Sequence, residues 1–166
     1  MIEFEECAQM LDEIADSMPY ELYRDLNGGI SLLPQLKVHP KALNNDLFIL
    51  GEYIRNSLGN AIVFYYGSIN RVYGHLSREE LYKQLVRIMH HEVRHHNEYL
   101  AGCDDLGDLD RIEIEEYLKK HKKNYMNFGR LLLQPPENFT INLILSHFYQ
   151  LTGINHVWIV QPVQIG

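Results

Sequence analysis

Residues 77–101 read SREELYKQLVRIMHHEVRHHNEYLA and form the longest stretch of the chain with a single periodic pattern. Ser77 and Glu80 have the spacing of a capping box, in which a serine caps the first turn of a helix and a glutamate three residues later bonds back to it. Apolar residues follow at helical spacing, and nothing interrupts the pattern before Gly102. The sequence therefore predicts a long helix that begins near Arg78 and faces the core.

Inside this helix, His91, Glu92 and His95 form the pattern His-Glu-x-x-His. Side chains four residues apart share one face of a helix, so the two imidazoles can hold one metal ion. The glutamate beside them is then placed to act as a base on a metal-activated water. This pattern is typical of a zinc hydrolase.

A catalytic zinc site takes three protein ligands and leaves one position for water, so a third ligand must join the two histidines. Asp105 is the first choice, because Gly102 allows a sharp turn and a carboxylate three residues later can return beneath the metal. Glu98 is the alternative third ligand. It lies seven residues after His91 and three after His95, although a straight helix tends to carry it past the metal.

The run from His91 to Asp105 resembles the motif His-Glu-x-x-His-x-x-Gly-x-x-Asp of small bacterial zincin-like metallopeptidases. The resemblance implies an α+β fold, a minimal zincin-like domain in which a small sheet packs on helices and the motif lies on the long central helix. It also implies Zn²⁺ on the two histidines and the aspartate, Glu92 as the catalytic base, and hydrolysis of a peptide bond. Similarity to clostridial-type members extends over about residues 2–118, including Leu26-Asn27-Gly28-Gly29-Ile30, Tyr65-Tyr66-Gly67-Ser68 and Tyr73-Gly74-His75-Leu76.

The spacing of the third ligand departs from that motif. Glu98 and Ala101 stand where the motif has its glycine and aspartate. Gly102 and Asp105 match the motif only with four extra residues, about one helical turn, after the second histidine. The choice between Asp105 and Glu98 therefore stays open.

The tail of the chain differs in charge from the rest. Residues 1–118 hold 21 of the 22 acidic residues and 10 of the 15 Lys and Arg, whereas residues 119–166 hold one acidic and five basic residues. We expect a metallopeptidase domain over residues 1–118 and a C-terminal extension over residues 119–166, outside the resemblance and of unpredicted architecture.

Other local patterns predict the elements around the motif helix. Strands are expected at residues 30–33, 47–53 and 61–66, with the last two as neighbours in a small sheet. A further extended piece at residues 69–73 is expected to pair with residues 61–66, and a second helix is expected at about residues 111–120. The strand at residues 61–66 is the expected edge for a peptide substrate.

Three tyrosines in this region are candidates for contacts to the substrate or its oxyanion: Tyr65, Tyr66 and Tyr73. Packing is the alternative role, because aromatic residues in strands usually serve the core.

Composition limits the classes of function. With 46% hydrophobic and 22% charged residues, the 166-residue chain can bury the core of an ordinary domain, and its net charge of −7 argues against a nucleic-acid partner. No apolar stretch has the length of a membrane span, and no secretion signal opens the chain, so a cytoplasmic location is expected. The sequence leaves open the oligomeric state. It also leaves an alternative function, a catalytically silent, metal-binding zincin-fold protein that acts as a binding or regulatory module.

Overall fold

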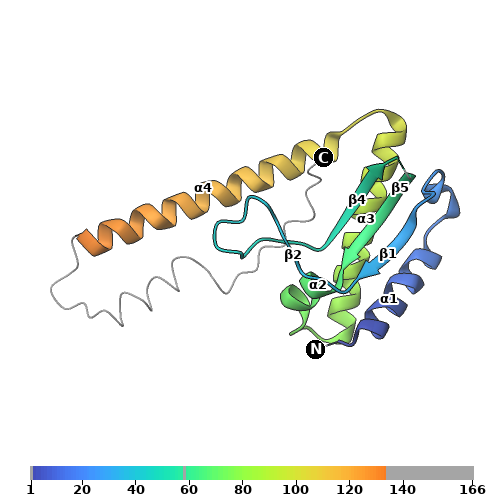
Figure 1. Cartoon of the computed structure of the whole chain (residues 1–166), viewed down its shortest axis with the longest axis horizontal. Helices are drawn as coiled ribbons and strands as arrows, with labels where there is room; N and C mark the ends of the chain where they lie inside the picture. The colour runs from blue at the N-terminus through green and yellow to red at the C-terminus, as the bar shows by residue number, and fades with distance from the viewer. Residues whose placement is uncertain (1, 58, 134–166) are drawn as a thin grey trace.

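The computed structural model describes residues 2–57 and 59–133, with side chains described as far as residue 122. The fold is of the α+β class, as expected: helices pack on one face of a small sheet, and a long helix leaves the body (Figure 1). The part of the predicted extension from residue 134 to 166 lies outside the described residues.

The main core lies between two helices and the sheet. Helix α1 (Phe4–Ser17) packs against α3 (Arg78–Ala101), and both cover the sheet face that carries Ile62 and Phe64. The apolar stripe of α1 is buried as its spacing predicts, at Cys7, Met10, Leu11 and Ile14. A short 3-10 helix, η1 (Tyr20–Tyr23), leads from α1 toward the first strand.

The sheet has the strand order β1-β5-β4. Strand β5 (Gly59–Tyr65) lies in the middle, parallel to β1 (Gly29–Leu33) and antiparallel to β4 (Gly51–Asn56). The strands expected at residues 47–53 and 61–66 are neighbours, so that prediction is confirmed. The prediction that residues 61–66 form the edge of the sheet is wrong. Because β1 occupies the far side of β5, the edge strand beside α3 is β4. A separate pair is formed by β2 (Lys37–Val38) and β3 (Phe48–Ile49).

The strand expected at residues 69–73 is wrong, because these residues belong to helix α2 (Tyr66–Tyr73). Its buried residues include Ile69, Val72 and Tyr73. They are β-branched and aromatic, which favours a strand, but their spacing of three and four residues is that of one helical face. The periodicity outweighs the composition here.

Helix α4 (Asp105–Leu133) is longer at both ends than the helix expected at residues 111–120. It begins directly after the turn at Gly102 and continues through residue 119, so the expected boundary between domain and extension falls inside one helix. Among the described residues, no helix combines the length and apolarity needed to cross a membrane.

Candidate metal centre

The motif helix begins and ends as its sequence predicts. Ser77 Oγ accepts a hydrogen bond from the backbone N–H of Glu80, whose carboxylate accepts one from the backbone N–H of Ser77. At the other end Gly102 has φ of 73°, the left-handed conformation that glycine adopts at low cost, and it ends α3. Between these caps, His91, Glu92 and His95 are all buried on α3.

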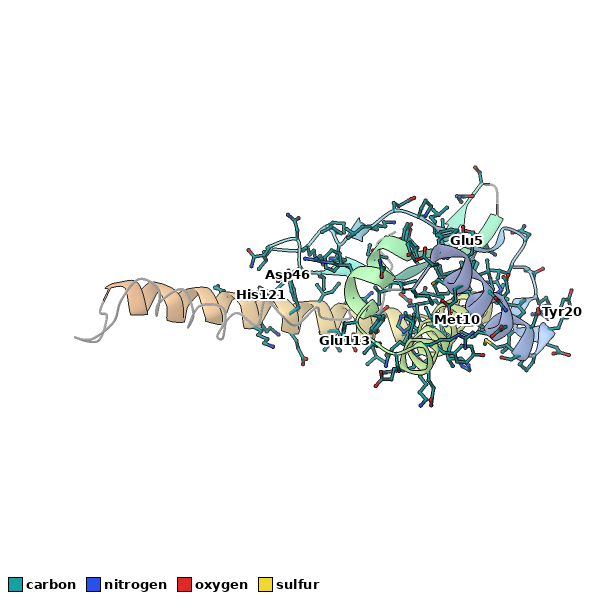
Figure 2. The ribbon with its side chains drawn as sticks, turned by 90° about the horizontal axis from the view of Figure 1, so that it is seen from below. Glu5, Met10, Tyr20, Asp46, Glu113 and His121 are labelled. Carbon is teal, nitrogen blue, oxygen red and sulfur yellow. The ribbon has the colours of Figure 1, made fainter. Side chains whose placement is uncertain are left out.

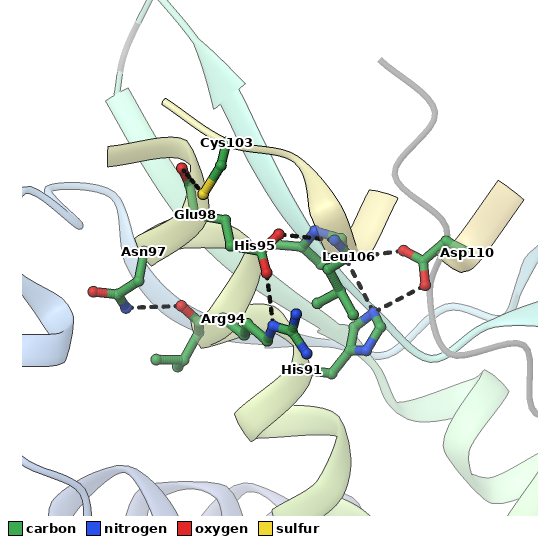
Figure 3. Close-up of polar contacts among 9 residues, drawn as sticks. His91, Arg94, His95, Asn97, Glu98, Cys103, Leu106 and Asp110 are labelled. Atoms are coloured by element: carbon green, nitrogen blue, oxygen red, sulfur yellow. Dashed lines mark hydrogen bonds and ion pairs between the residues drawn. The ribbon is translucent and has the colours of Figure 1, made fainter. Parts of the chain in front are cut away.

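The two histidines meet a carboxylate from α4, that of Asp110 (Figure 3). The Nε2 atoms of His91 and His95 lie 3.0 Å apart. Asp110 Oδ2 lies 3.0 Å from His95 Nε2, and its Oδ1 lies 3.5 Å from His91 Nε2. All three side chains are buried. Two imidazoles and one carboxylate, groups that could hold a metal ion, thus converge inside the protein.

These separations fit a tetrahedral metal ion. Zinc binds imidazole nitrogen and carboxylate oxygen at about 2.0–2.1 Å, and a tetrahedral angle then places two ligand atoms about 3.3 Å apart. The separations of 3.0 Å between the two Nε2 atoms and between His95 Nε2 and Asp110 Oδ2 lie near that figure, and the 3.5 Å contact of His91 Nε2 is to the other carboxylate oxygen, Oδ1. Three side chains leave a fourth position for water or substrate, which is the arrangement of catalytic zinc sites.

The expected third ligands lie elsewhere, so both choices for that position need correction. Asp105 is exposed in the first turn of α4, because the chain enters this helix at once instead of passing beneath the histidines. Glu98 is used in joining the helices: its carboxylate accepts hydrogen bonds from Arg94 Nε at 2.7 Å and from the backbone N–H of Leu106 at 2.9 Å. Glu98 therefore holds the start of α4, which carries Asp110.

Ionisation of the two carboxylates is consistent with these roles. Burial opposes the charge of Asp110, but its hydrogen bonds to His91 and His95 outweigh burial and hold its pKa below the ordinary value. Burial likewise opposes ionisation of Glu98, yet its bonds to Leu106 and Arg94 keep its pKa low. Both groups are therefore anions at neutral pH, the form that a metal ligand or helix cap requires.

A second acid stands beside this cluster on α4. Burial and the neighbouring charge of Asp110 raise the pKa of Glu113. Glu113 is near enough to Asp110 and His91 for their charges to affect it, and sequence reasoning did not single it out.

Glu92 is fully buried and directly follows His91 on the motif helix. The role expected for Glu92, that of a base, stays a prediction. A carboxylate removed from water in this way is kept for a specific partner or task more often than for packing.

None of the three expected tyrosines reaches this cluster. Tyr65 donates to Glu52 and accepts from Lys37 at 3.0 Å, as part of an ion pair away from the histidines. Tyr66 donates to the carbonyl of Ile2 at 2.6 Å. Tyr73 is 3.4 Å from Gln84 Oε1, near the other end of α3. None of these hydrogen bonds goes to His91, His95 or Asp110, and the contacts expected to a substrate or its oxyanion stay a prediction.

A buried polar cluster fastens α4 to the body farther along the helix. Asp46, from the loop before β3, lies 2.8 Å from His121 Nε2 and accepts a hydrogen bond from Tyr117 (Figure 2). The Tyr117 hydroxyl also accepts from the backbone N–H of Leu43 at 3.1 Å. Since Tyr117 and His121 lie seven and eleven residues after Asp110, on the same face, this cluster fixes the rotation of α4 that aims Asp110 at the histidines.

Asp110 was missed because the expected helix began one residue after it. With α4 starting at Asp105, Asp110 falls on the helix's buried stripe, among Leu106, Ile114 and Tyr117. An aspartate on an apolar stripe needs a partner inside the protein, since a buried charge without one is very costly. That position in the pattern is the signal that could have identified it.

Comparisons with known proteins give a fold relationship. No family model matches the chain, and no curated protein matches it. A solved structure described as a conserved hypothetical protein from Thermus thermophilus is similar, with 28% sequence identity and a TM-score of 0.53. The match covers 61% of this chain and 100% of that protein. A whole smaller protein thus corresponds to about three fifths of this one.

Proposed function

We propose that the protein is a zinc-dependent metallopeptidase with a minimal zincin-like domain. The observation that carries the proposal is the convergence of His91, His95 and Asp110 from two helices at the separations of a tetrahedral zinc site, directly beside Glu92. The donor set, two imidazoles and one carboxylate, is of the kind that catalytic zinc sites use. These three side chains are buried, so water competes less for them and binding of an ion is favoured.

The substrate is a peptide or a segment of a protein, and β4 is the strand that receives it. Tyr65 donates its backbone N–H to the carbonyl of Leu50 at 2.8 Å. This bond shows which residues of β4 hydrogen-bond to β5 and which face the open side of the sheet. Because such bonds alternate along an antiparallel pair, the backbone groups of Tyr53 and Arg55 point away from β5. An extended peptide can add to this edge beside α3.

His91, His95 and Asp110 would hold the Zn²⁺ ion, which when bound would supply Lewis acidity for peptide hydrolysis. Glu92 accepts the proton of the attacking water and delivers it to the nitrogen of the departing amine. His91 and His95 stay neutral donors of a nitrogen lone pair, and the negative charge of Asp110 balances part of the ion's charge. The exposed edge of β4 holds the scissile bond over the site.

The test pairs metal content with peptide cleavage in the purified full chain. We expect the wild type to bind about one equivalent of Zn²⁺, the stoichiometry of a catalytic site, and to cut members of a mixed peptide library, as followed by mass spectrometry. Glu92→Gln should keep the zinc and lose the cleavage. Glu79→Gln, the same change at an exposed position of the same helix, should leave both unchanged.

Zinc retained at full occupancy in His91→Ala would overturn the assignment of the site. Zinc bound by the wild type with no cleavage of any library would favour the alternative function, a silent metal-binding module.

A further inference from the structure

A pocket of about 150 Å³ opens beside His95, between the edge strand and the turn that joins α3 to α4. Tyr53 and Arg55 of β4 form one wall. The other wall consists of Tyr99, Cys103 and Asp104 from the end of α3 and the turn. A peptide paired with β4 would therefore direct a side chain into this space next to the metal centre.

The pocket is lined by a cation, Arg55, that forms no ion pair within the described part of the chain. The Arg55 guanidinium lies 4.4 Å from the centre of the Tyr99 ring, a cation–π contact that fixes its position and leaves its N–H donors for a ligand. No carboxylate among the described residues lies in ion-pair range of Arg55. Asp104, the acid of the pocket, lies 3.9 Å from Arg111, a side chain that also pairs with Asp108.

A buried donor without a partner lies beside that cation. Tyr53 is 5% exposed, and its hydroxyl has no hydrogen-bond partner among the described residues. Burial raises the pKa of Tyr53 to about 12, with a smaller opposing effect from Arg55, so the hydroxyl stays protonated. Buried hydroxyls are normally hydrogen-bonded, so this one is unusual, but its oxygen has almost no accessible surface and is not open to the pocket.

We propose that this pocket binds a carboxylate of the peptide substrate, held by Arg55. The proposal rests on the proposed function and names the substrate class: peptides with an acidic residue next to the scissile bond. A planar guanidinium donates two parallel hydrogen bonds to a carboxylate, which an amide of the same shape cannot match in charge. The same chemistry is offered by a side-chain carboxylate and by the carboxylate at a peptide's end.

The test measures binding of labelled peptides to the full-length, zinc-loaded Glu92→Gln protein by fluorescence anisotropy. Three peptides differ at one position, Glu, Gln or Lys, and carry an amidated C-terminus; a fourth has Gln and a free C-terminal carboxylate. We expect the Glu peptide to bind about tenfold more tightly than the Gln peptide, and the Lys peptide to bind most weakly. Preference for the fourth peptide over the amidated Gln peptide would place the terminal carboxylate in the pocket.

Variants of Arg55 assign the preference to this pocket. Arg55→Gln should remove it, and Arg55→Glu should reverse it in favour of the Lys peptide. Arg87→Glu makes the same change of charge at an exposed position of α3 and should leave the preference intact. Tyr53→Phe removes only a buried hydroxyl and should leave the ratio of Glu to Gln binding unchanged. Zinc content and circular dichroism show that each variant is folded.

Equal binding of the Glu and Gln peptides would overturn the proposal that this pocket binds a carboxylate. An unchanged preference in Arg55→Glu would overturn it as well. These outcomes are distinct from failure of the proposed function. If the wild type cuts Glu and Gln peptides equally well, the proposed peptidase activity stands and the proposed carboxylate pocket does not. If it prefers the Glu peptide but cuts nothing, the pocket stands and the peptidase activity does not.

Discussion

Asp110 Oδ2 lies 3.0 Å from His95 Nε2, although the two residues are 15 positions apart and belong to different helices. The contact depends on the turn at Gly102, which reverses the chain between α3 and α4. Glu98 accepts a hydrogen bond from the first turn of α4, and this bond, three residues after His95, helps to set the angle between α3 and α4. The metal centre is thus a property of the joined helices and not of the motif helix alone.

Exchange of Asp110 should separate the proposed ligand from the one expected from the sequence. We expect Asp110→Asn to lower zinc affinity by more than the roughly 10- to 100-fold that loss of a ligand's outer partner costs. Asp105→Asn removes the same charge five residues earlier, at an exposed position, and should leave zinc affinity unchanged. Competition with a chromophoric chelator measures both. Equal losses in the two variants would contradict the assignment of Asp110.

Much of the site could be predicted from local pattern. The capping box at Ser77 and the glycine at position 102 bracket α3 as their chemistry requires, and His91, Glu92 and His95 follow from spacing on one helix. The third ligand could not be predicted in this way, because it depends on where α4 begins. That start is set by the bond from Leu106 to Glu98, a contact between two elements that no single periodic pattern contains.

The sheet illustrates the same limit. The neighbours β4 and β5 are joined by a short turn, so their pairing is local and was predictable. The pairing of β1 with β5 is parallel and joins Gly29 to Ala61 across a long connection. Only that distant pairing decides that β5 is central and β4 is the edge.

Asp46 should prove important for the attachment of α4. Asp46→Asn weakens the bonds to both His121 and Tyr117, which are buried, so we expect the free energy of unfolding to fall by about 1–3 kcal/mol. Glu115→Gln alters an exposed pair with Lys119 on the same helix and should cost well under 1 kcal/mol. Urea denaturation of the two variants measures the difference. Equal stability would show that the cluster does not hold the helix.

The two cysteines should differ sharply in reactivity toward iodoacetamide. Cys7 is fully buried in α1, and burial, with a smaller effect of Glu6, raises its pKa to about 11, so almost none of it is thiolate at pH 8. Cys103 is exposed. We expect one adduct on the native protein, at Cys103, and two after denaturation, counted by mass spectrometry.

Peptide binding should slow that reaction, because Cys103 lines the pocket beside His95. Protection by the Glu peptide but not by the Lys peptide is the expected pattern. Labelling of Cys7 in the native protein would contradict the packing of α1.

Amide hydrogen exchange should show which backbone N–H groups of β4 are bonded to β5 and which face the open edge. The backbone N–H groups of Glu52 and Ile54 point into the β4–β5 ladder, whereas those of Tyr53 and Arg55 point to the open edge. We expect slow hydrogen exchange for the first pair and fast exchange for the second, measured by NMR. A bound peptide should slow exchange at Tyr53 and Arg55. Slow exchange there in the free protein would mean that the edge is already covered.

The turn at Gly102 between α3 and α4 would make a bound ion a cross-link between the two helices. An ion shared by His91 and Asp110 would tie the two helices together in the folded state. Only the folded chain brings the three side chains together, so the ion would bind the folded state alone. The free energy of that binding would therefore add to the free energy of unfolding. At a free zinc concentration of 100 times Kd, this linkage adds about 2.7 kcal/mol. Chelation would therefore release α4 before it disturbs the core between α1, α3 and the sheet.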